Sequence, residues 1–237
     1  MQRIDEVAAR SHVHRSQAFD DTLHLIVCTL GRPYMEGEYL DTVKRYCDGE
    51  KGNRAIDTIV RFFGDLINAM STCDEDLLGD MFEAGISHGA AGQVFTPTPL
   101  CKLIARITLP SESTNLDGRR TVADPCCGSG RMLLAAAELQ PHWHFFGQDI
   151  DLTCVRMTAI NLALRNRYGH VIWGNTLANE QRLVYETGRV QVWGNAIRKV
   201  RLERAPPIVQ QVAKQNSQQA TDVREGKSQL HLFDEVS

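Results

Sequence analysis

The sequence contains no apolar run that approaches the roughly 18 residues needed to cross a bilayer, and no apolar signal segment follows the charged N-terminus MQRIDEVAARSH. These absences argue against a membrane or secreted protein, so we expect a cytoplasmic location. Positive charge is not in excess either, because 26 Lys and Arg face 29 Asp and Glu, which gives a formal net charge of -3. Any contact with DNA must therefore be local or be supplied by a partner.

Paired cysteines are also missing. The seven cysteines are an odd number, and none of them forms a CxxC pair or a matching spacing with histidine. We expect reduced thiols, and we predict neither a disulfide framework nor a zinc site. With 237 residues, of which 43% are hydrophobic, the chain is long enough for one sizeable core or for one domain plus a smaller module.

The chain divides into three regions by its patterns. Residues 1–90 are predicted to form a helical N-terminal module, because apolar residues recur three and four positions apart between Ser16 and Ser87. The simplest interpretation of this module is a packing domain without chemistry of its own. Residues 205–237 are too polar to bury a core, so we expect a flexible, disordered tail there.

Residues 91–204 alternate short apolar runs with helical segments, as in TVAD, SGRMLLAAAEL and HFFGQD. This alternation is typical of βαβ units. We therefore predict an α/β fold with a parallel, doubly wound sheet, which binds its ligand at the carboxyl ends of the strands.

A glycine-rich turn stands where the first predicted strand of this region passes into a helix, in VADPCCGSG at residues 122–130. A phosphate-binding P-loop would need Lys and Ser or Thr after Gly130, but Arg131 and Met132 follow it. A dinucleotide-binding turn would need a third glycine where Leu133 stands. Both nucleotide interpretations therefore fail, and the acidic Asp124 before the turn suits a ligand that carries an ammonium group.

A second acidic position follows about 20 residues after the turn, at the end of the next predicted strand, where a carboxylate commonly holds ribose hydroxyls. Asp149 is the better candidate for this role. Asp151 precedes a helical segment and is expected to cap it. Ile150 is expected to lie against the flat face of an adenine.

Four motifs follow one another in the order GQVFTP (92–97), DPCCGSG (124–130), GQDID (147–151) and GNTL (174–177). Together they resemble the ordered motifs of the adenine-specific (N6) DNA methyltransferases, most closely those of the modification subunits of type I restriction-modification systems. The resemblance covers residues 76–177. It implies a Rossmann-like core that uses S-adenosylmethionine to methylate the exocyclic amine of adenine in DNA. It also implies a specificity subunit or a second methyltransferase subunit as a partner.

The resemblance assigns cofactor contacts to particular positions of this chain. Phe95, Thr96 and Pro97 would contact the amino-acid end of S-adenosylmethionine, and its methionine portion would be lined by Asp124, Cys126, Gly128 and Gly130. Asp149 would bind the ribose. Ile150 and Asn175 would contact the adenine of the cofactor. Simpler interpretations stand beside these roles. Cys126 and Cys127 are expected to be small turn residues, because no adjacent base would activate a thiol nucleophile. Within Thr96-Pro97-Thr98-Pro99, a loop followed by a helix start with proline in its first turn is expected.

The family pattern is broken where the target base would be held. The family uses an Asn/Asp-Pro-Pro-Tyr/Phe motif, in which the aromatic ring stacks on the flipped adenine and the polar groups orient its amine. That motif is absent from the sequence, and the sole Pro-Pro lies in the degenerate candidate Ala205-Pro206-Pro207-Ile208. Ala205 has no side-chain acceptor and Ile208 no aromatic face, so the catalytic residues stay unassigned. Asn175 departs as well, because the family usually has aspartate there.

Three interpretations stay open, because the last strands of a methyltransferase sheet and a target-recognition domain are not found either. The chain is a methyltransferase that takes its missing parts from a partner or uses an unusual catalytic loop. Alternatively, it is a non-catalytic cofactor-binding or DNA-associated module. The third interpretation is a truncated remnant of a methyltransferase.

The polar tail carries one further motif, QLHLF at residues 229–233. It resembles the pentapeptide with which bacterial replication and repair proteins bind the sliding clamp, with Gln229, Leu230, Leu232 and Phe233 as the contact residues. A disordered tail would present such a peptide freely. The alternative is an amphipathic end that packs on its own domain.

Overall fold

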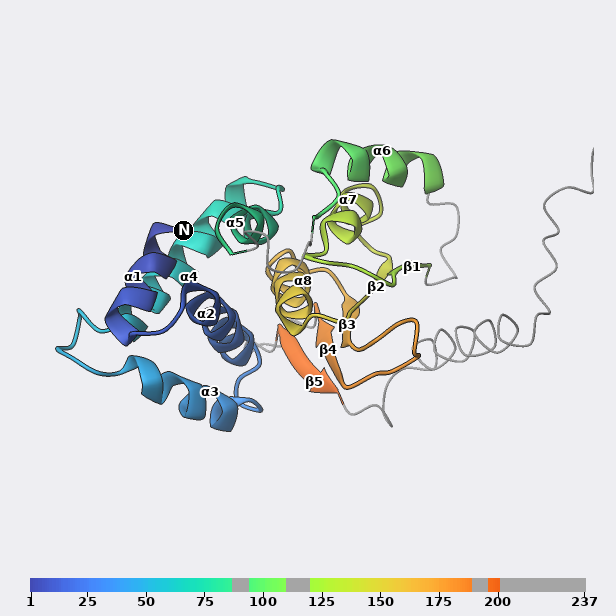
Figure 1. Ribbon diagram of the computed structural model, residues 1–237. Coiled ribbons are helices and arrows are strands. Elements are labelled where there is room, and N and C mark those ends of the chain that lie inside the picture. The colour runs from blue at the N-terminus through green and yellow to red at the C-terminus, as the bar shows by residue number, and fades with distance from the viewer. Residues whose placement is uncertain (87–93, 110–119, 189–195, 201–237) are drawn as a thin grey trace, which may run out of the picture.

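A computed structural model of the chain describes residues 1–86, 94–109, 120–188 and 196–200. The degenerate Pro-Pro segment at 205–208 and the predicted clamp peptide at 229–233 lie outside the described residues, as do Gly92 and Gln93. Within the described ranges, helices gather on one side of a sheet (Figure 1). In the same ranges no helix has both the length and the apolar composition needed to cross a membrane.

Helices occupy nearly all of the described N-terminal region, which we call the helical module. They are α1 (Gln2–Ser11), α2 (Arg15–Leu30), α3 (Glu36–Val43), the short 3-10 helix η1 (Lys44–Tyr46), α4 (Ala55–Thr72) and α5 (Leu77–Gly85). Each longer helix turns an apolar stripe inward, as the periodicity of the sequence predicts. The apolar core formed by these stripes is continuous with that of the sheet, and it joins Ile4 and Phe19 to Phe145 and Val171.

The rest of the described chain forms a five-stranded sheet in the order β1-β2-β3-β4-β5. Its strands are β1 (Thr121–Asp124), β2 (His144–Asp149), β3 (Gly169–Trp173), β4 (Leu183–Thr187) and β5 (Ile197–Val200), and its helices are α6 (Thr98–Thr108), α7 (Arg131–Leu139) and α8 (Leu152–Leu164). The predicted α/β class is confirmed. Strands β1, β2 and β3 run parallel and are connected through α7 and α8.

The prediction of a wholly parallel, doubly wound sheet is wrong for the described strands. Strand β4 runs antiparallel to β3, and β5 runs antiparallel to β4. A parallel pair needs a long crossover, usually a helix, but only the loop 174–182 separates β3 from β4. The strand order also advances in one direction without the reversal that a doubly wound sheet has.

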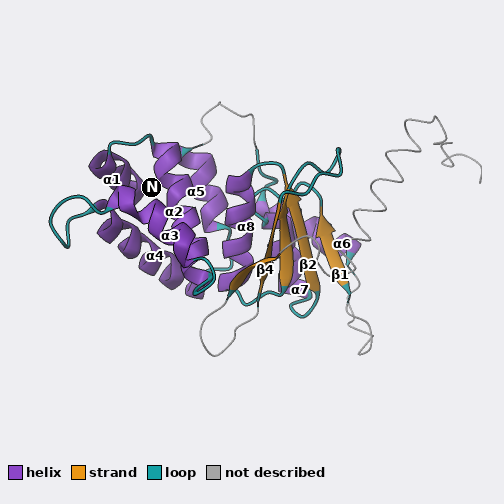
Figure 2. Cartoon of the chain, turned by 90° about the horizontal axis from the view of Figure 1, so that it is seen from below, coloured by secondary structure: helices purple, strands orange, loops and turns teal. Residues whose placement is uncertain are grey.

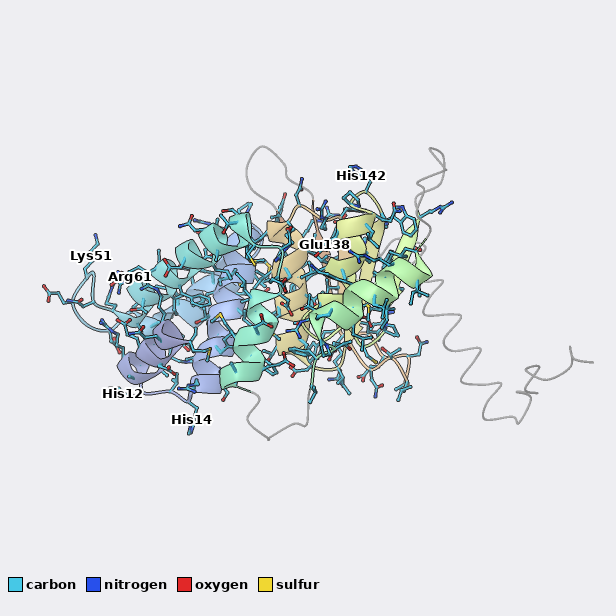
Figure 3. The ribbon with its side chains drawn as sticks, turned by 90° about the horizontal axis from the view of Figure 1, so that it is seen from above. His12, His14, Lys51, Arg61, Glu138 and His142 are labelled. Atoms are coloured by element: carbon cyan, nitrogen blue, oxygen red, sulfur yellow. The ribbon has the colours of Figure 1, made fainter. Side chains whose placement is uncertain are left out.

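Helix α8 joins the two halves of the structure. It packs against α2 on one side and against strands β2, β3 and β4 on the other, and it lies between the module and the sheet in Figure 2. This position explains why α8 is mostly apolar on every face, and its buried Arg156 and Asn161 have hydrogen-bond partners in Asp20 and Asp76. Helix α6 packs on α7 further along the sheet, where Lys102 pairs with Glu138 at 3.1 Å. Glu138 on α7 is labelled in Figure 3.

Candidate functional site

The glycine-rich turn connects the end of β1 to the start of α7, as predicted. Gly128 and Gly130 have φ values of 53° and 88°, a left-handed conformation that residues with a Cβ rarely adopt. Space is short as well, because a Cβ at Gly128 would lie 2.8 Å from the Phe95 ring, and one at Gly130 would lie 3.0 Å from the Thr158 side chain. Both glycines are therefore required by backbone conformation and by packing.

Two carboxylates flank this turn at the ends of neighbouring parallel strands. Asp149 accepts hydrogen bonds from the backbone N–H of Gly128 at 2.8 Å and of Asp151 at 2.9 Å, one on each carboxylate oxygen. Asp124 accepts from the N–H of Cys126 at 3.1 Å. Burial raises the pKa of Asp124, and the nearby charge of Asp149 adds to this effect. The site is therefore negatively charged and suits a ligand with a cationic group.

The Phe95-Thr96-Pro97 segment lies beside the glycine turn, although more than 25 residues separate it from the turn in the sequence. The Phe95 N–H donates to the Glu83 carboxylate at 2.9 Å, and the Phe95 ring stacks on Phe82 with a centroid separation of 5.6 Å. Thr96 and Pro97 are exposed next to it. The structure thus brings the first motif to the second.

The third motif lies at the end of β2 and at the start of α8. Ile150 is 59% exposed directly after Asp149, and its backbone carbonyl accepts from the Trp173 indole N–H at 3.0 Å. Asp151 is the N-cap of α8 and accepts from the Thr153 N–H at 2.8 Å. The predicted capping role of Asp151 is confirmed. The predicted helix start at Thr98 and Pro99 is confirmed as well, because α6 begins there with proline in its first turn.

Asn175, in the fourth motif, follows β3 at the same end of the sheet. Its side-chain oxygen accepts from the backbone N–H groups of Leu177 and Ala178 at 3.0 and 3.2 Å, so it holds the shape of its own loop. The neighbouring Thr176 hydroxyl donates to the Pro125 carbonyl at 2.6 Å, which ties this loop to the glycine turn. Residues from all four motifs therefore converge at the carboxyl ends of β1, β2 and β3.

The two cysteines of the turn differ in exposure but not in the direction of their pKa. Cys126 is exposed and Cys127 is buried against the Thr158 hydroxyl, 3.6 Å away. Burial raises the pKa of both thiols, and the charges of Asp149 and Asp124 raise it further. A raised pKa keeps a thiol protonated, which is the opposite of what activates a cysteine nucleophile.

Asp76, which is not among the residues predicted from the sequence, supports the glycine turn through a buried contact with Ser129. Asp76 is 2% exposed and caps α5 by accepting from the Gly79 N–H at 3.0 Å. Its carboxylate also accepts from the Ser129 hydroxyl inside the glycine turn and from the Asn161 side-chain amide on α8 at 2.9 Å. Asp76 therefore links the helical module, the turn and α8 through one buried carboxylate.

Arg131, the first residue of α7, completes this network. Its guanidinium donates to Asp76 at 3.1 Å, to Asp80 at 2.8 Å and to Glu83 at 3.1 Å. The guanidinium carbon lies 5.7 Å from the centre of the Phe95 ring. A sequence pattern could have indicated this network. Acidic residues at 76, 80 and 83 are spaced to share one helix face, and Arg131, which follows the glycine turn directly, is a basic partner for them.

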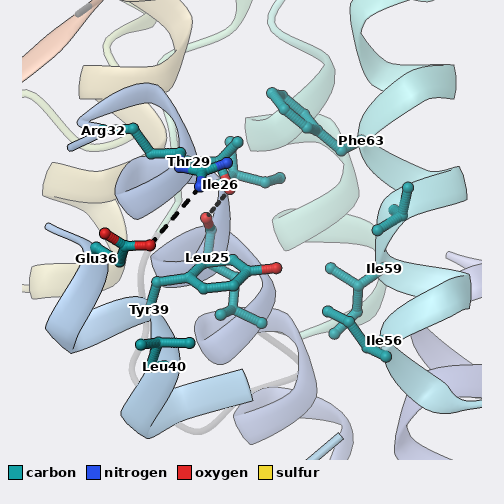
Figure 4. A pocket seen from close by; sticks show the side chains of 11 residues that line it. Leu25, Ile26, Thr29, Arg32, Glu36, Tyr39, Leu40, Ile56, Ile59 and Phe63 are labelled. Atoms are coloured by element: carbon teal, nitrogen blue, oxygen red, sulfur yellow. Dashed lines mark hydrogen bonds and ion pairs between the residues drawn. The ribbon is translucent and has the colours of Figure 1, made fainter. Parts of the chain in front are cut away.

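Two cavities differ in their position relative to the four motifs. One of about 260 Å³ lies between α6, β1 and α7, and Asp124 and Pro125 are among its lining residues. Another, of about 280 Å³, lies between α2, α3 and α4 in the helical module (Figure 4). Most side chains that line the second cavity are apolar, and none of its lining residues belongs to the four motifs.

Comparison with known proteins places this geometry in context. Residues 73–192 match the N-6 DNA methylase family. The type I restriction enzyme MjaVIII methylase subunit of Methanocaldococcus jannaschii is 29% identical over 130 residues, which are 48% of this chain and 22% of that protein. The type I restriction enzyme MpnII methylase subunit of Mycoplasma pneumoniae is 32% identical over 102 residues, which are 38% of this chain and 18% of that protein.

The matched part thus spans about a fifth of the length of these curated relatives. No solved structure matches the chain. The family match includes every residue of the converging site, from Phe95 to Asn175, and it also includes Asp76 and Arg131.

Proposed function

We propose that this chain, which belongs to the N-6 DNA methylase family, binds S-adenosylmethionine at the glycine turn and takes part in methylating the exocyclic amine of adenine in DNA. The family match confirms the resemblance that the four motifs indicated. The observation that carries the proposal is the convergence of these motifs around two carboxylates at neighbouring strand ends.

The residues present fit the cofactor. The Asp149 carboxylate is oriented by two backbone N–H groups, and each oxygen has a further lone pair to accept from one of two adjacent ribose hydroxyls. Asp124 is a partly buried carboxylate that a cationic ammonium group would stabilise in its charged form. The exposed side chain of Ile150 offers an apolar surface for adenine.

When bound, S-adenosylmethionine supplies an electrophilic methyl group on its sulfonium sulfur. The chain's own residues bind and orient this group. Gly128 and Gly130 let the backbone turn closely at the strand end, and the buried Asp76 carboxylate holds Ser129 and Arg131 on the far side of the turn. Such pre-organisation fixes the position of a reacting group before the substrate arrives.

We further propose that a partner holds the target base. A flipped adenine needs an aromatic ring to stack on and acceptors for its amine, and the 237 residues contain no Asn/Asp-Pro-Pro-Tyr/Phe motif. The relatives are named as methylase subunits of type I restriction enzymes. A specificity subunit or a second methylase subunit is therefore the proposed partner on DNA, and the reducing cytoplasm is the proposed location for a chain with seven free thiols.

A second candidate function is a cofactor-binding or DNA-associated module without catalysis, or a truncated methyltransferase. It is favoured by the missing base-holding motif and by Asn175, whose side-chain oxygen is engaged by the backbone of its own loop. The two functions share the cofactor site and differ in methyl transfer alone.

Methyl transfer from labelled S-adenosylmethionine to adenine-containing DNA separates these functions. The chain is assayed alone and together with co-expressed specificity and methylase subunits, and cofactor binding is measured by calorimetry in parallel. We expect binding by the chain alone and transfer in the presence of the subunits. Binding without transfer under both conditions would support the non-catalytic function, and absence of binding would contradict the cofactor site.

We also propose that QLHLF binds a bacterial sliding clamp, with Leu232 and Phe233 as apolar anchors and Gln229 as a polar contact. Burial of each apolar side chain contributes roughly 1.5 to 3 kcal/mol, so replacing both anchors with alanine should abolish detectable binding. Cofactor affinity should stay unchanged in this double variant. A pull-down in which both proteins retain the clamp equally would contradict the proposal.

A further inference from the structure

A cluster of three chemically different side chains lies in the helical module, away from the four motifs. His24 and Cys28 are one helical turn apart on α2, so they point from the same face. The Cys28 sulfur lies 3.7 Å from Nε2 and 4.0 Å from Nδ1 of His24. Glu38 on α3 completes the group, because ligand atoms of all three residues lie within 4.8 Å of one another.

These distances resemble those of a tetrahedral zinc site. Zinc lies about 2.3 Å from a thiolate sulfur and about 2.0 to 2.1 Å from an imidazole nitrogen, so a tetrahedral angle places sulfur and nitrogen about 3.5 Å apart. The observed separation is 3.7 Å. One thiolate, one imidazole and one carboxylate form a ligand set that suits Zn²⁺ and Co²⁺, whereas Ca²⁺ and Mg²⁺ take oxygen ligands.

Burial differs within the cluster in a way that leaves an approach for an ion. Cys28 is fully buried, whereas His24 and Glu38 are half-buried. Burial lowers the pKa of His24, and the charge of Arg156 lowers it further. Burial raises the pKa of the Cys28 thiol to about 12.

One cation already contacts the cluster. The Lys199 ammonium on β5 donates to both oxygens of Glu38, at 2.9 and 3.1 Å, and both side chains are 41% exposed. An exposed ion pair of this kind contributes only about 0 to 1 kcal/mol. A divalent ion bound by three ligands would therefore displace the ammonium from Glu38 into water.

We propose that His24, Cys28 and Glu38 bind one Zn²⁺ ion. Binding forms one bond from each residue to zinc, and the proton of the Cys28 thiol passes to solvent. Three protein ligands leave a fourth position for water. The sequence-based prediction of no zinc site rested on CxxC and histidine spacings, and it overlooked a His-x3-Cys pair on one helix that a separate helix completes.

The proposed site is distinct from the apolar cavity of the helical module. Glu36, Tyr39 and Leu40 line that cavity and are labelled in Figure 4, whereas Glu38 is not one of its lining residues. Glu38 is two residues from Glu36 and from Leu40, so it points to the other side of α3, toward Lys199 and β5. Zinc at this position would link α2 to α3 next to β5 of the sheet.

The test uses the purified full chain after chelation of adventitious metal. Co²⁺ is titrated first, because a tetrahedral site with a thiolate gives intense visible bands and a sulfur-to-cobalt charge-transfer band. Zn²⁺ is then added, and we expect it to abolish the cobalt spectrum at one equivalent per chain. This readout does not depend on methyl transfer, so it is independent of the proposed function.

Substitution of each of the three residues tests whether it binds the metal. Loss of a residue that only orients a metal ligand costs about 10-fold to 100-fold in metal affinity. Loss of a ligand itself should cost at least as much, so Cys28→Ser, His24→Gln and Glu38→Gln should each weaken binding by that factor or more. Lys199→Met removes the competing ammonium and should tighten binding severalfold. Cys47→Ser, which removes an exposed thiol outside the cluster, is the matched control and should leave binding unchanged.

Circular dichroism of the metal-free variants checks their folding. Glu38→Gln and Lys199→Met alter only half-exposed and exposed side chains, so their opposite effects test the site even if Cys28→Ser fails to fold. A cobalt spectrum that survives Cys28→Ser unchanged would overturn the proposal. A chain that takes up no stoichiometric Zn²⁺, or a Lys199→Met variant that binds more weakly, would overturn it as well.

Discussion

The turn after β1 and the loop after β3 lie at the same end of the sheet, but they are held in different ways. The glycine turn is fixed by side chains from distant elements, including Asp76 from the helical module and Asn161 from α8. The loop after β3 is shaped mainly by its own Asn175 and touches the turn through Thr176. At its tip, Leu177 is 91% exposed.

The two parts of the site therefore differ in how firmly they are held. The glycine turn is pre-organised by a buried network, as a specific binding site requires. The loop after β3, whose Asn175 the resemblance assigns to the adenine of the cofactor, is held mainly by local contacts and is open. The comparison therefore predicts that the turn contributes more to cofactor affinity than the loop does.

The largest expected effect is a loss of stability when Asp76, which joins the glycine turn to α5 and α8, is replaced. Asp76→Ala leaves the Arg131 guanidinium, which is 8% exposed, without its buried partner, and breaking one side of a buried ion pair costs about 3 to 5 kcal/mol. The free energy of unfolding, measured by chemical denaturation, should fall by this amount. Asp74→Ala, at an exposed position nearby, is the control and should change it by less than about 0.5 kcal/mol.

A second substitution tests the cofactor part directly. Asp149→Ala removes the acceptor proposed for two ribose hydroxyls, and hydrogen bonds to a charged group contribute about 1.5 to 3 kcal/mol. Calorimetry should show S-adenosylmethionine binding that is about tenfold to a hundredfold weaker. Asp151→Ser retains a capping residue on α8 and should leave affinity unchanged. Equal affinity of the native protein and the Asp149 variant would remove Asp149 from the site.

A smaller effect is expected where the two regions meet. Thr176→Val keeps the side-chain shape but removes the hydroxyl that donates to the Pro125 carbonyl. A single hydrogen bond of this type contributes about 0.5 to 1.5 kcal/mol, so cofactor affinity should fall only severalfold. A loss as large as that of the Asp149 variant would show that the loop is as important to the cofactor as the turn.

The smallest effect concerns protonation of Asp124. Because burial raises the pKa of this carboxyl, it takes up a proton at a higher pH than an ordinary aspartate, whose pKa is about 3.9. A carboxylate that binds an ammonium group does so above its pKa and loses this contribution as the pH falls through it. Cofactor affinity should therefore decline modestly as the pH falls through this raised pKa, and the decline should begin at a higher pH than it would for an ordinary aspartate.

Asp124→Asn should bind more weakly at neutral pH and show a flatter dependence over the same range. Both proteins are compared by calorimetry at matched ionic strength, with circular dichroism at each pH to exclude unfolding. Parallel pH profiles for the two proteins would assign the dependence to another group.

The sequence by itself determined the features that depend on neighbouring residues. The turn between β1 and α7 could be predicted because glycine is needed where the backbone is left-handed. The Asp151 cap and the proline start of α6 could be predicted because each involves contacts within a few residues. The order of the four motifs indicated the family for the same reason, since each motif is a local pattern.

Only the tertiary structure decided the features that join distant parts of the chain. The carboxylate of Asp76 meets Ser129 and Asn161, which lie 53 and 85 residues away, and Glu38 meets Lys199 at a separation of 161 residues. The antiparallel addition of β4 to β3 depended on a short connection beside an available strand edge. Local patterns do not specify such pairings, because side chains far apart in sequence become neighbours only when the elements between them have packed.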